Sequence, residues 1–215
     1  MSMNNSELIE QIAEKDFDVD TFVQLAIKNE HVRNEVVHQM LTNSAIMIYY
    51  HCYYIVDKAS QERPKLFISF WGEIAKLLQH KNSYHRDFAL DIIGNLTIVD
   101  LENRFLEIRD EYISTINDEK FMTGIHCVKN LLKIYQNKPD QRESILNLLL
   151  DIDRQCEYTE KQIGVLKADV LEIFDEIYED IPERNRINEF LRTEANCISP
   201  KTRKKAKELI KKYYL

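Results

Sequence analysis

The stretch SYHRDFALDIIGNL, residues 83–96, shows most clearly how this chain is built. A small residue, Ala89, is followed by the apolar residues Ile92, Ile93 and Leu96 at positions +3, +4 and +7. This spacing places four apolar side chains on one face of a helix. The stretch therefore predicts a helix whose small residue packs closely against a neighbouring helix.

The same pattern returns along the chain. Its five copies are Cys52-Ile55-Val56-Ala59, Ala89-Ile92-Ile93-Leu96, Val128-Leu131-Leu132-Tyr135, Val170-Ile173-Phe174-Ile177 and Ala206-Leu209-Ile210-Tyr213. Successive copies are 37, 39, 42 and 36 residues apart. A period near 40 residues, long enough for two helices, is typical of a HEAT or armadillo-type repeat array.

On these copies the chain resembles the HEAT-like, armadillo-type helical repeat family, from about Glu30 to Leu215. The resemblance implies an all-α fold, a right-handed α–α superhelix (an α-solenoid) of about five helical hairpins. An irregular helical bundle is the alternative, because chance can produce two or three copies of so degenerate a motif. Residues 1–215 then form a single repeat domain, with 1–29 as N-terminal capping helices and 199–215 as a basic C-terminal capping helix.

The limits of the helices are predicted from breaks in the apolar pattern and from capping residues. The second helices of the hairpins are expected at about 44–59, 83–98, 119–136, 160–180 and 200–214, and their partners at about 31–42, 65–80, 101–116, 141–156 and 183–195. Ser199 followed by Pro200 predicts one helix start, and Thr159 with Gln162 predicts a capping box at another. Asp20 is expected to cap a leading helix within residues 6–29.

Composition limits the class of protein. The 215 residues are 44% hydrophobic and 30% charged, with only four glycines and four prolines, which favours helices joined by short links. A formal charge of −7 weighs against a nucleic-acid partner. The longest apolar stretch, AIMIYY, is too short to span a membrane, and the first residues lack a basic start followed by an apolar run, so we expect no signal peptide. Four isolated cysteines fit a reducing compartment, so we expect a cytoplasmic protein.

Residues 49–56, YYHCYYIV, hold the densest group of aromatic side chains. A helical period places Tyr49 and Cys52 on the repeat core, whereas Tyr50, His51 and Tyr54 lie off that core. One interpretation is aromatic packing onto the N-terminal helices and the next hairpin. The other is a partner-binding platform formed by Tyr50 and Tyr54.

No group of residues predicts catalysis, a cofactor or a metal. His51-Cys52 and His126-Cys127 are adjacent pairs whose side chains diverge on a helix, so neither forms a nucleophile–base pair. No histidine has a metal-ligand spacing. Asp87 and Asp91 share a helix face and are expected to be solvated.

The C-terminal stretch SPKTRKKAKELIKKYYL, residues 199–215, is strongly basic: seven lysines and arginines against one glutamate give +6. Residues 169–183 before it carry seven acids. If the two helices stack, Asp169 should face Lys205, Asp175 should face Lys211, and Glu176 should face Lys212. Alternatively, Lys204, Lys205, Lys211 and Lys212 form a basic surface that binds an acidic partner.

Three functions are therefore open. The first is a non-enzymatic scaffold that binds a protein or peptide on one face of the repeat array. The second is a DNA-binding or DNA-repair enzyme of the HEAT-like alkylpurine glycosylase type, for which Trp71 and acidic residues on inner helices are the candidates, although a broad positive surface is lacking. The third, a bilin lyase or isomerase, would need shorter repeats rich in alanine and glycine. The oligomeric state is left open.

Overall fold

A computed structural model of the chain describes residues 5–182 and 184–215. These residues form helices and connecting turns and contain no β-strand, which confirms the all-α expectation. Residues 1–4 of the expected N-terminal cap, and residue 183 of the expected helix 183–195, lie outside the described part. The chain divides into two compact units, up to Arg109 and from Asp110 onward, with the division inside one helix.

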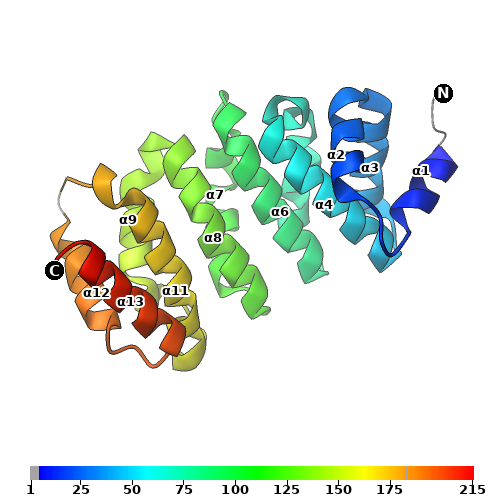
Figure 1. Cartoon of the computed structure of the whole chain (residues 1–215). Helices are drawn as coiled ribbons and strands as arrows, with labels where there is room; N and C mark the ends of the chain where they lie inside the picture. The colour runs from blue at the N-terminus through cyan, green and yellow to red at the C-terminus, as the bar shows by residue number, and fades with distance from the viewer. Residues whose placement is uncertain (1–4, 183) are drawn as a thin grey trace. The chain divides into compact units, whose positions relative to one another are not determined.

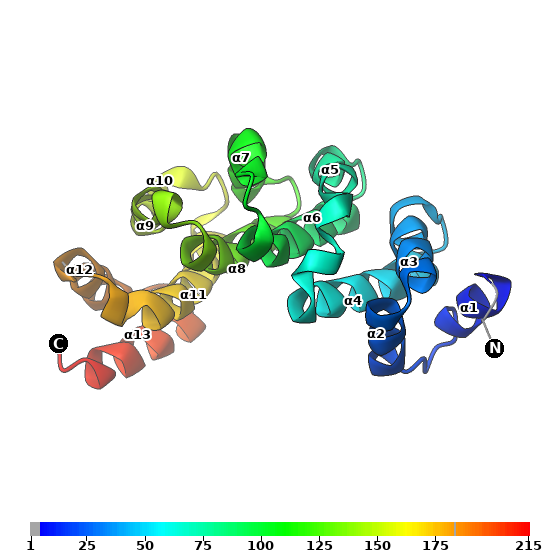
Figure 2. The same ribbon diagram turned by 90° about the horizontal axis from the view of Figure 1, so that it is seen from above.

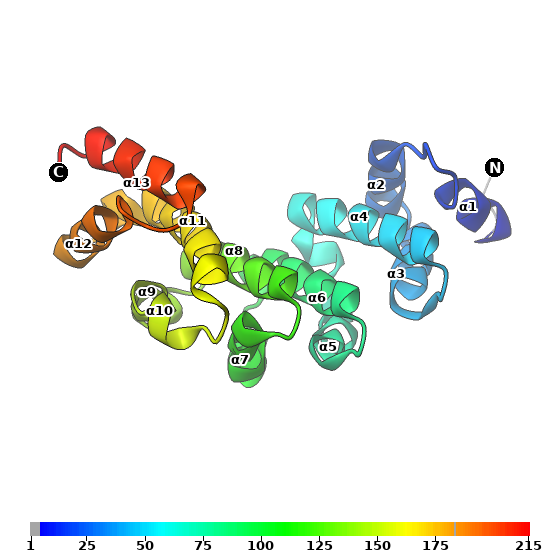
Figure 3. The ribbon, with the colours of Figure 1, turned by 90° about the horizontal axis from the view of Figure 1, so that it is seen from below.

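The first unit begins with α1 (Asn5–Ile12), α2 (Val19–Lys28), α3 (Glu30–Thr42) and α4 (Ile46–Glu62). It continues with η1 (Pro64–Leu66), η2 (Ile68–Phe70), α5 (Trp71–Ala75), η3 (Lys76–Gln79), α6 (Ser83–Leu96), η4 (Thr97–Val99) and the first half of α7 (Arg104–Ser114). Helices α1, α2 and α3 all pack on α4, and α4 packs on α6. Helices α4 and α6 lie side by side in Figure 3.

The second unit holds the rest of α7, η5 (Thr115–Asn117), α8 (Phe121–Asn137), η6 (Pro139–Gln141), α9 (Arg142–Leu150) and α10 (Ile152–Gln155). It ends with α11 (Glu160–Ile177), η7 (Tyr178–Asp180), α12 (Asn185–Glu194) and α13 (Pro200–Lys212). Helix α11 packs on both α8 and α13, and α12 packs on α13. In Figure 1 these helices run from green to red, and Figure 2 shows α9, α10 and α12 on one side of α8 and α11.

The predicted second helices agree with α4, α6, α8, α11 and α13 to within a few residues at each end. Two of the predicted first helices of the hairpins are not single helices in the structure. The stretch 65–80 is divided among η1, η2, α5 and η3, and the stretch 141–156 among η6, α9 and α10. In the first case Phe67, Phe70 and Trp71 crowd one segment, and aromatic side chains lose rotamer freedom in an α-helix.

Helix starts show where capping rules succeed and fail. Ser199 accepts from the backbone of Thr202, and Thr159 forms the predicted capping box with Gln162. The expected cap at Asp20 is wrong: Asp18 accepts from the backbone N–H groups of Asp20 and Thr21 and caps α2. Asp20 lies instead in the first turn, where a negative charge is favourable as well.

The repeated small position is fully buried in every copy of the motif. Cys52, Ala89, Val128, Val170 and Ala206 each have 0% exposure. Most of the apolar residues that follow them at +3, +4 and +7 are buried too, with Leu132, Ile210 and Tyr213 only partly so. The sequence pattern therefore identified the buried face of all five helices.

Hydrogen bonds also recur at the repeat distance. In the first unit, Tyr53 donates to Asp91 and Asn95 donates to Asp57, each across 38 positions. In the second unit, the hydroxyl of Thr202 donates to the carbonyl of Gly164, again across 38 positions, and other bonds span 38–40 positions: Asn117–Gln155, Asn117–Glu157, Tyr158–Asp118, Arg186–Asn147 and Tyr213–Asp175. Segments about one motif period apart in the sequence are thus joined by polar contacts as well as by apolar packing.

No described helix has the length and hydropathy needed to cross a membrane.

Candidate binding surface on α4 and α6

Helix α4 carries the tyrosine-rich stretch, and its first eleven residues, Ile46–Val56, include no Asp, Glu, Lys or Arg. The helical period places the aromatic side chains of α4 on two different faces. Tyr49 faces the core at 4% exposure, whereas Tyr54 is 45% exposed. Tyr50 lies between these extremes.

His51 belongs to the interior. It is buried, its Nδ1 donates to the carbonyl of Ile12 (2.6 Å), and its ring stacks on Phe17 with centroids 4.0 Å apart. These contacts fix the N-terminal helices to α4. The expectation of aromatic packing onto those helices is confirmed for His51.

Tyr53 holds α4 to α6, a role that the sequence pattern did not single out. Its ring stacks on Phe88 at 4.0 Å with the planes 8° apart, and its hydroxyl donates to Oδ2 of Asp91 (2.5 Å). Burial, and then the charge of Asp91, raises the pKa of Tyr53 far above its usual value, so the hydroxyl keeps its proton. The 38-residue spacing between Tyr53 and Asp91 was the available signal.

Tyr50 is the centre of an aromatic cluster. Its ring lies edge-on to those of Tyr53, Tyr54, Tyr84 and Phe88, with centroids 5.2–5.9 Å apart. Edge-to-face contacts at this distance are favourable and restrict ring motion. Burial, followed by Tyr54, Tyr84 and then Asp87, raises the pKa of Tyr50.

Together these contacts produce an exposed surface, here called the tyrosine face. It consists of Ile46, Met47, Tyr50 and Tyr54 of α4 with Tyr84 of α6. Ile46 is 62% exposed, Met47 46% and Tyr84 44%. The predicted platform residues Tyr50 and Tyr54 thus lie side by side, and Tyr84 joins them from the next hairpin.

The carboxylates near this face are not solvated as expected. Asp87 is 7% exposed, and Asp91 is partly buried and accepts from Tyr53. The expectation failed because α6 is covered on nearly all sides, so even its polar positions are shielded. These acids are shielded from open solvent.

Neighbouring histidines are also part of the packing. His85 stacks on His80 at 4.3 Å and contacts the ring of Tyr49 at 4.8 Å. Burial lowers the pKa of His85 to about 4, so it is neutral at pH 7. A buried neutral histidine between aromatic rings supports the shape of the cluster.

The basic C-terminal residues divide into two groups. Lys205 lies 2.6 Å from Glu172 and 3.3 Å from Asp175, and Lys212 lies 2.6 Å from Asp175. Lys204 and Lys211 are exposed, with Lys204 3.9 Å from Glu208 of its own helix. Half of the predicted basic surface is therefore engaged with α11.

The expected stacking of opposite charges is confirmed, but the expected pairs are wrong. Asp169 pairs with Lys201 (3.4 Å) rather than with Lys205, and Asp175 pairs with Lys205 and Lys212 rather than with Lys211. Lysine side chains are long enough to reach along the neighbouring helix, so the pairing shifts by up to a turn. Burial opposes the charge on Asp175, but hydrogen bonds from Lys212, Tyr213 and Lys205 outweigh it and lower its pKa.

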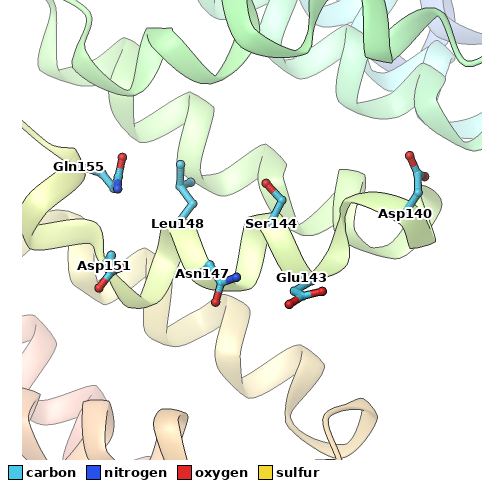
Figure 4. A pocket seen from close by; sticks show the side chains of 7 residues that line it. All are labelled: Asp140, Glu143, Ser144, Asn147, Leu148, Asp151 and Gln155. Atoms are coloured by element: carbon cyan, nitrogen blue, oxygen red, sulfur yellow. The ribbon is translucent and has the colours of Figure 1, made fainter.

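Two hollows of the second unit have polar linings. The larger, of about 560 Å³, runs along α9 and is lined by Asp140, Glu143, Ser144, Asn147, Leu148, Asp151 and Gln155. Figure 4 shows these side chains, which come from η6, α9, α10 and the turn between α9 and α10, projecting to different sides instead of converging on a point. The smaller, of about 240 Å³, holds the buried Lys167, which is 2.6 Å from Asp153 and 2.8 Å from Glu194. The charge of Lys167 is therefore already paired with two carboxylates of the same hollow.

Three of the four cysteines have interior roles. Cys52, Cys127 and Cys156 are buried, and burial raises the pKa of Cys52 and Cys127 to about 12 and that of Cys156 to about 11. The Sγ of Cys127 points to the carbonyl of Tyr112 (3.6 Å). Thiols in this state are poor nucleophiles. Within residues 5–182 and 184–215, no three His, Cys, Asp or Glu side chains are grouped as metal ligands would be.

Comparison with family models, with curated proteins and with solved structures finds no match to this chain.

Proposed function

We propose that the hairpins are HEAT- or armadillo-type repeats and that the chain is a right-handed solenoid of about five of them. Three observations support this. The sequence motif recurs about every 40 residues, each copy has a fully buried small residue, and hydrogen bonds join positions 38–40 apart.

We infer further that the protein is a non-enzymatic module that binds a protein or peptide on the tyrosine face. The single observation that carries this function is a cluster of aromatic side chains that is both exposed and firmly supported. Tyr54 and Tyr84 are nearly half exposed, and the ring of Tyr50 between them is held by Tyr53 and Phe88. Tyrosines with restricted rotamers bind partners at low entropic cost and are frequent energetic centres of interfaces.

A glycosylase acting on DNA is the weaker alternative. Trp71, its aromatic candidate, is 5% exposed and belongs to the core. Lys201, Lys205 and Lys212, part of the basic region, form ion pairs with α11. Phosphate binding requires lysines and arginines that are available to the backbone of the nucleic acid, so these observations favour a protein partner.

This function can be tested by affinity capture from a cell lysate of the source organism. The experiment compares the unaltered protein with two variants. The Tyr50→Ala/Tyr54→Ala variant should lose the proteins captured by the unaltered chain while keeping its helical circular dichroism. Tyr214→Ala is the matched control, because Tyr214 is 96% exposed and lies far along the chain from the tyrosine face. Equal capture by all three forms would refute a role for the tyrosine face.

A further inference from the structure

We propose that the tyrosine face recognises arginine side chains of a basic segment in a partner protein. This inference rests on the proposed function and adds the chemistry of the partner. It follows from two independent features, the exposure of Tyr54 and Tyr84 without a cation over their rings and the negative charge of the first unit.

Three tyrosine rings of the second unit each have a cation of the same chain placed over them. The guanidinium of Arg142 lies 5.4 Å from the ring centre of Tyr135, and that of Arg184 lies 4.9 Å from Tyr178. The ammonium of Lys212 lies 5.2 Å from Tyr213. In each case a cation of the same chain covers the ring.

The tyrosine face differs in this respect. Among the residues that the structure describes, no cation is placed over the rings of Tyr50, Tyr54 or Tyr84. Tyr54 and Tyr84 keep almost half of their surface exposed. A cation placed over a tyrosine ring is attracted by the negative face of the ring, and more strongly where water is excluded.

Charge favours the same ligand. Residues 1–109 carry sixteen acidic and eleven basic side chains, a net charge of −5. Asp87 is close enough to raise the pKa of Tyr50, and Asp91 accepts a hydrogen bond from Tyr53. The first eleven residues of α4 add no positive charge that would repel a cation.

Arginine fits this surface better than lysine does. Its guanidinium is planar and weakly hydrated, so it stacks on aromatic rings, and its N–H groups can donate to tyrosine hydroxyls at the same time. A segment with several arginines could place successive side chains on Tyr54, Tyr50 and Tyr84.

The test uses a labelled twelve-residue peptide of alternating arginine and glycine, and fluorescence anisotropy near 0.15 M salt. Its control is the same peptide with citrulline, a neutral isostere, at every arginine. The full-length protein should bind the arginine peptide at least about tenfold more tightly than the citrulline peptide. Tyr50→Ala/Tyr54→Ala should lose at least about tenfold in affinity for the arginine peptide. Tyr50→Phe/Tyr54→Phe, which keeps the rings and their packing, should keep most of it.

A second variant separates recognition from general attraction to an acidic protein. Asp140→Asn/Glu143→Gln/Asp151→Asn neutralises the open hollow along α9, which lies in the other unit. Its affinity for the arginine peptide should be unchanged. If this variant loses binding while the alanine variant keeps it, or if arginine and citrulline peptides bind equally, the proposal is overturned. Tighter binding of a proline-rich peptide of equal length would overturn it as well.

The two proposals fail separately. If lysate capture depends on Tyr50 and Tyr54 but the arginine peptide does not bind, the arginine specificity is wrong and the binding function stands. If neither depends on the two tyrosines, both are wrong.

Discussion

At the scale of single residues, the fold depends on small side chains where helices meet. Ala89 has no exposed surface, and it occupies a slot that recurs in all five copies of the motif. Close-packed interiors respond to a change of even one methylene group. The size of the residue at this slot is thus set by the neighbouring helix and not by helix propensity.

Replacing Ala89 with phenylalanine should lower the free energy of unfolding by about 1–3 kcal/mol, because the added ring overpacks the slot. Urea denaturation measures the change. Ala13→Phe serves as the control, since Ala13 is exposed and should tolerate the ring. A change at Ala89 no larger than that at Ala13 would show that the helices can separate there at little cost.

Tyr53 permits a second residue-scale prediction. Tyr53→Phe retains the ring that stacks on Phe88 but removes the hydroxyl that donates to Asp91. The loss should be about 1.5–3 kcal/mol, the usual range for a hydrogen bond to a charged group. Tyr54→Phe removes a hydroxyl from an exposed neighbour and should be nearly neutral. If the two changes lower stability equally in a thermal melt, the hydroxyl of Tyr53 does not help to join α4 to α6.

At the scale of elements, the last helix is joined to its neighbour partly by charge. Asp175 of α11 contacts Lys205, Lys212 and the hydroxyl of Tyr213, and its side chain is 18% exposed. Exposed ion pairs contribute only about 0–1 kcal/mol each, but this carboxylate is shared by three donors and partly shielded from water. Its contribution should therefore be measurable.

Asp175→Asn should destabilise the protein by about 1 kcal/mol at pH 7, since it removes the charge that both lysines contact. The folded pKa of Asp175 is lowered below its usual 3.8, so its contribution is complete above that value and is lost as the pH falls through the folded pKa. The difference between the two proteins in urea melts should accordingly shrink as the pH falls below 3.8. A difference that does not depend on pH would assign the effect to packing and not to charge.

Salt provides a further measurement on the same element. Charge interactions are screened over about 8 Å at physiological ionic strength and over about 3 Å near 1 M. Hydrogen exchange of residues 199–215 should therefore accelerate as salt rises from low to near-molar concentration, while α8 changes little. Equal responses of α13 and α8 would mean that apolar contacts of Ala206 and Leu209 suffice to hold the last helix.

At the scale of the whole molecule, charge determines which partners are attracted. The chain carries a net charge of −7. Several lysines of its most basic segment form ion pairs with acids of α11. A protein that neutralises phosphates shows an affinity that falls steeply with salt. We do not expect this protein to bind nucleic acid with such a salt dependence.

Duplex DNA should not bind measurably near 0.15 M salt, and methylated duplex DNA should not release alkylated bases when incubated with the protein. Anisotropy of labelled duplex and a base-release assay measure the two outcomes. A steep dependence of affinity on salt, equivalent to several phosphate contacts, would instead support the glycosylase alternative.

The sequence alone determined the helical class, the five second helices and their buried faces. These are local properties. The period of apolar residues fixes which side of a helix is buried, and caps such as Ser199 and the box formed by Thr159 and Gln162 fix where helices begin. Tyr50 and Tyr54 could be placed off the core for the same reason.

Only the tertiary structure decided three other features: the breaks within 65–80 and 141–156, the pairing of Asp175 with Lys205 and Lys212, and the inclusion of Tyr84 in the tyrosine face. Each depends on how far neighbouring helices are offset and how far flexible side chains reach across the gap. A lysine can contact an acid one helical turn away from its equivalent position, so sequence spacing specifies the neighbouring helix but not the partner residue.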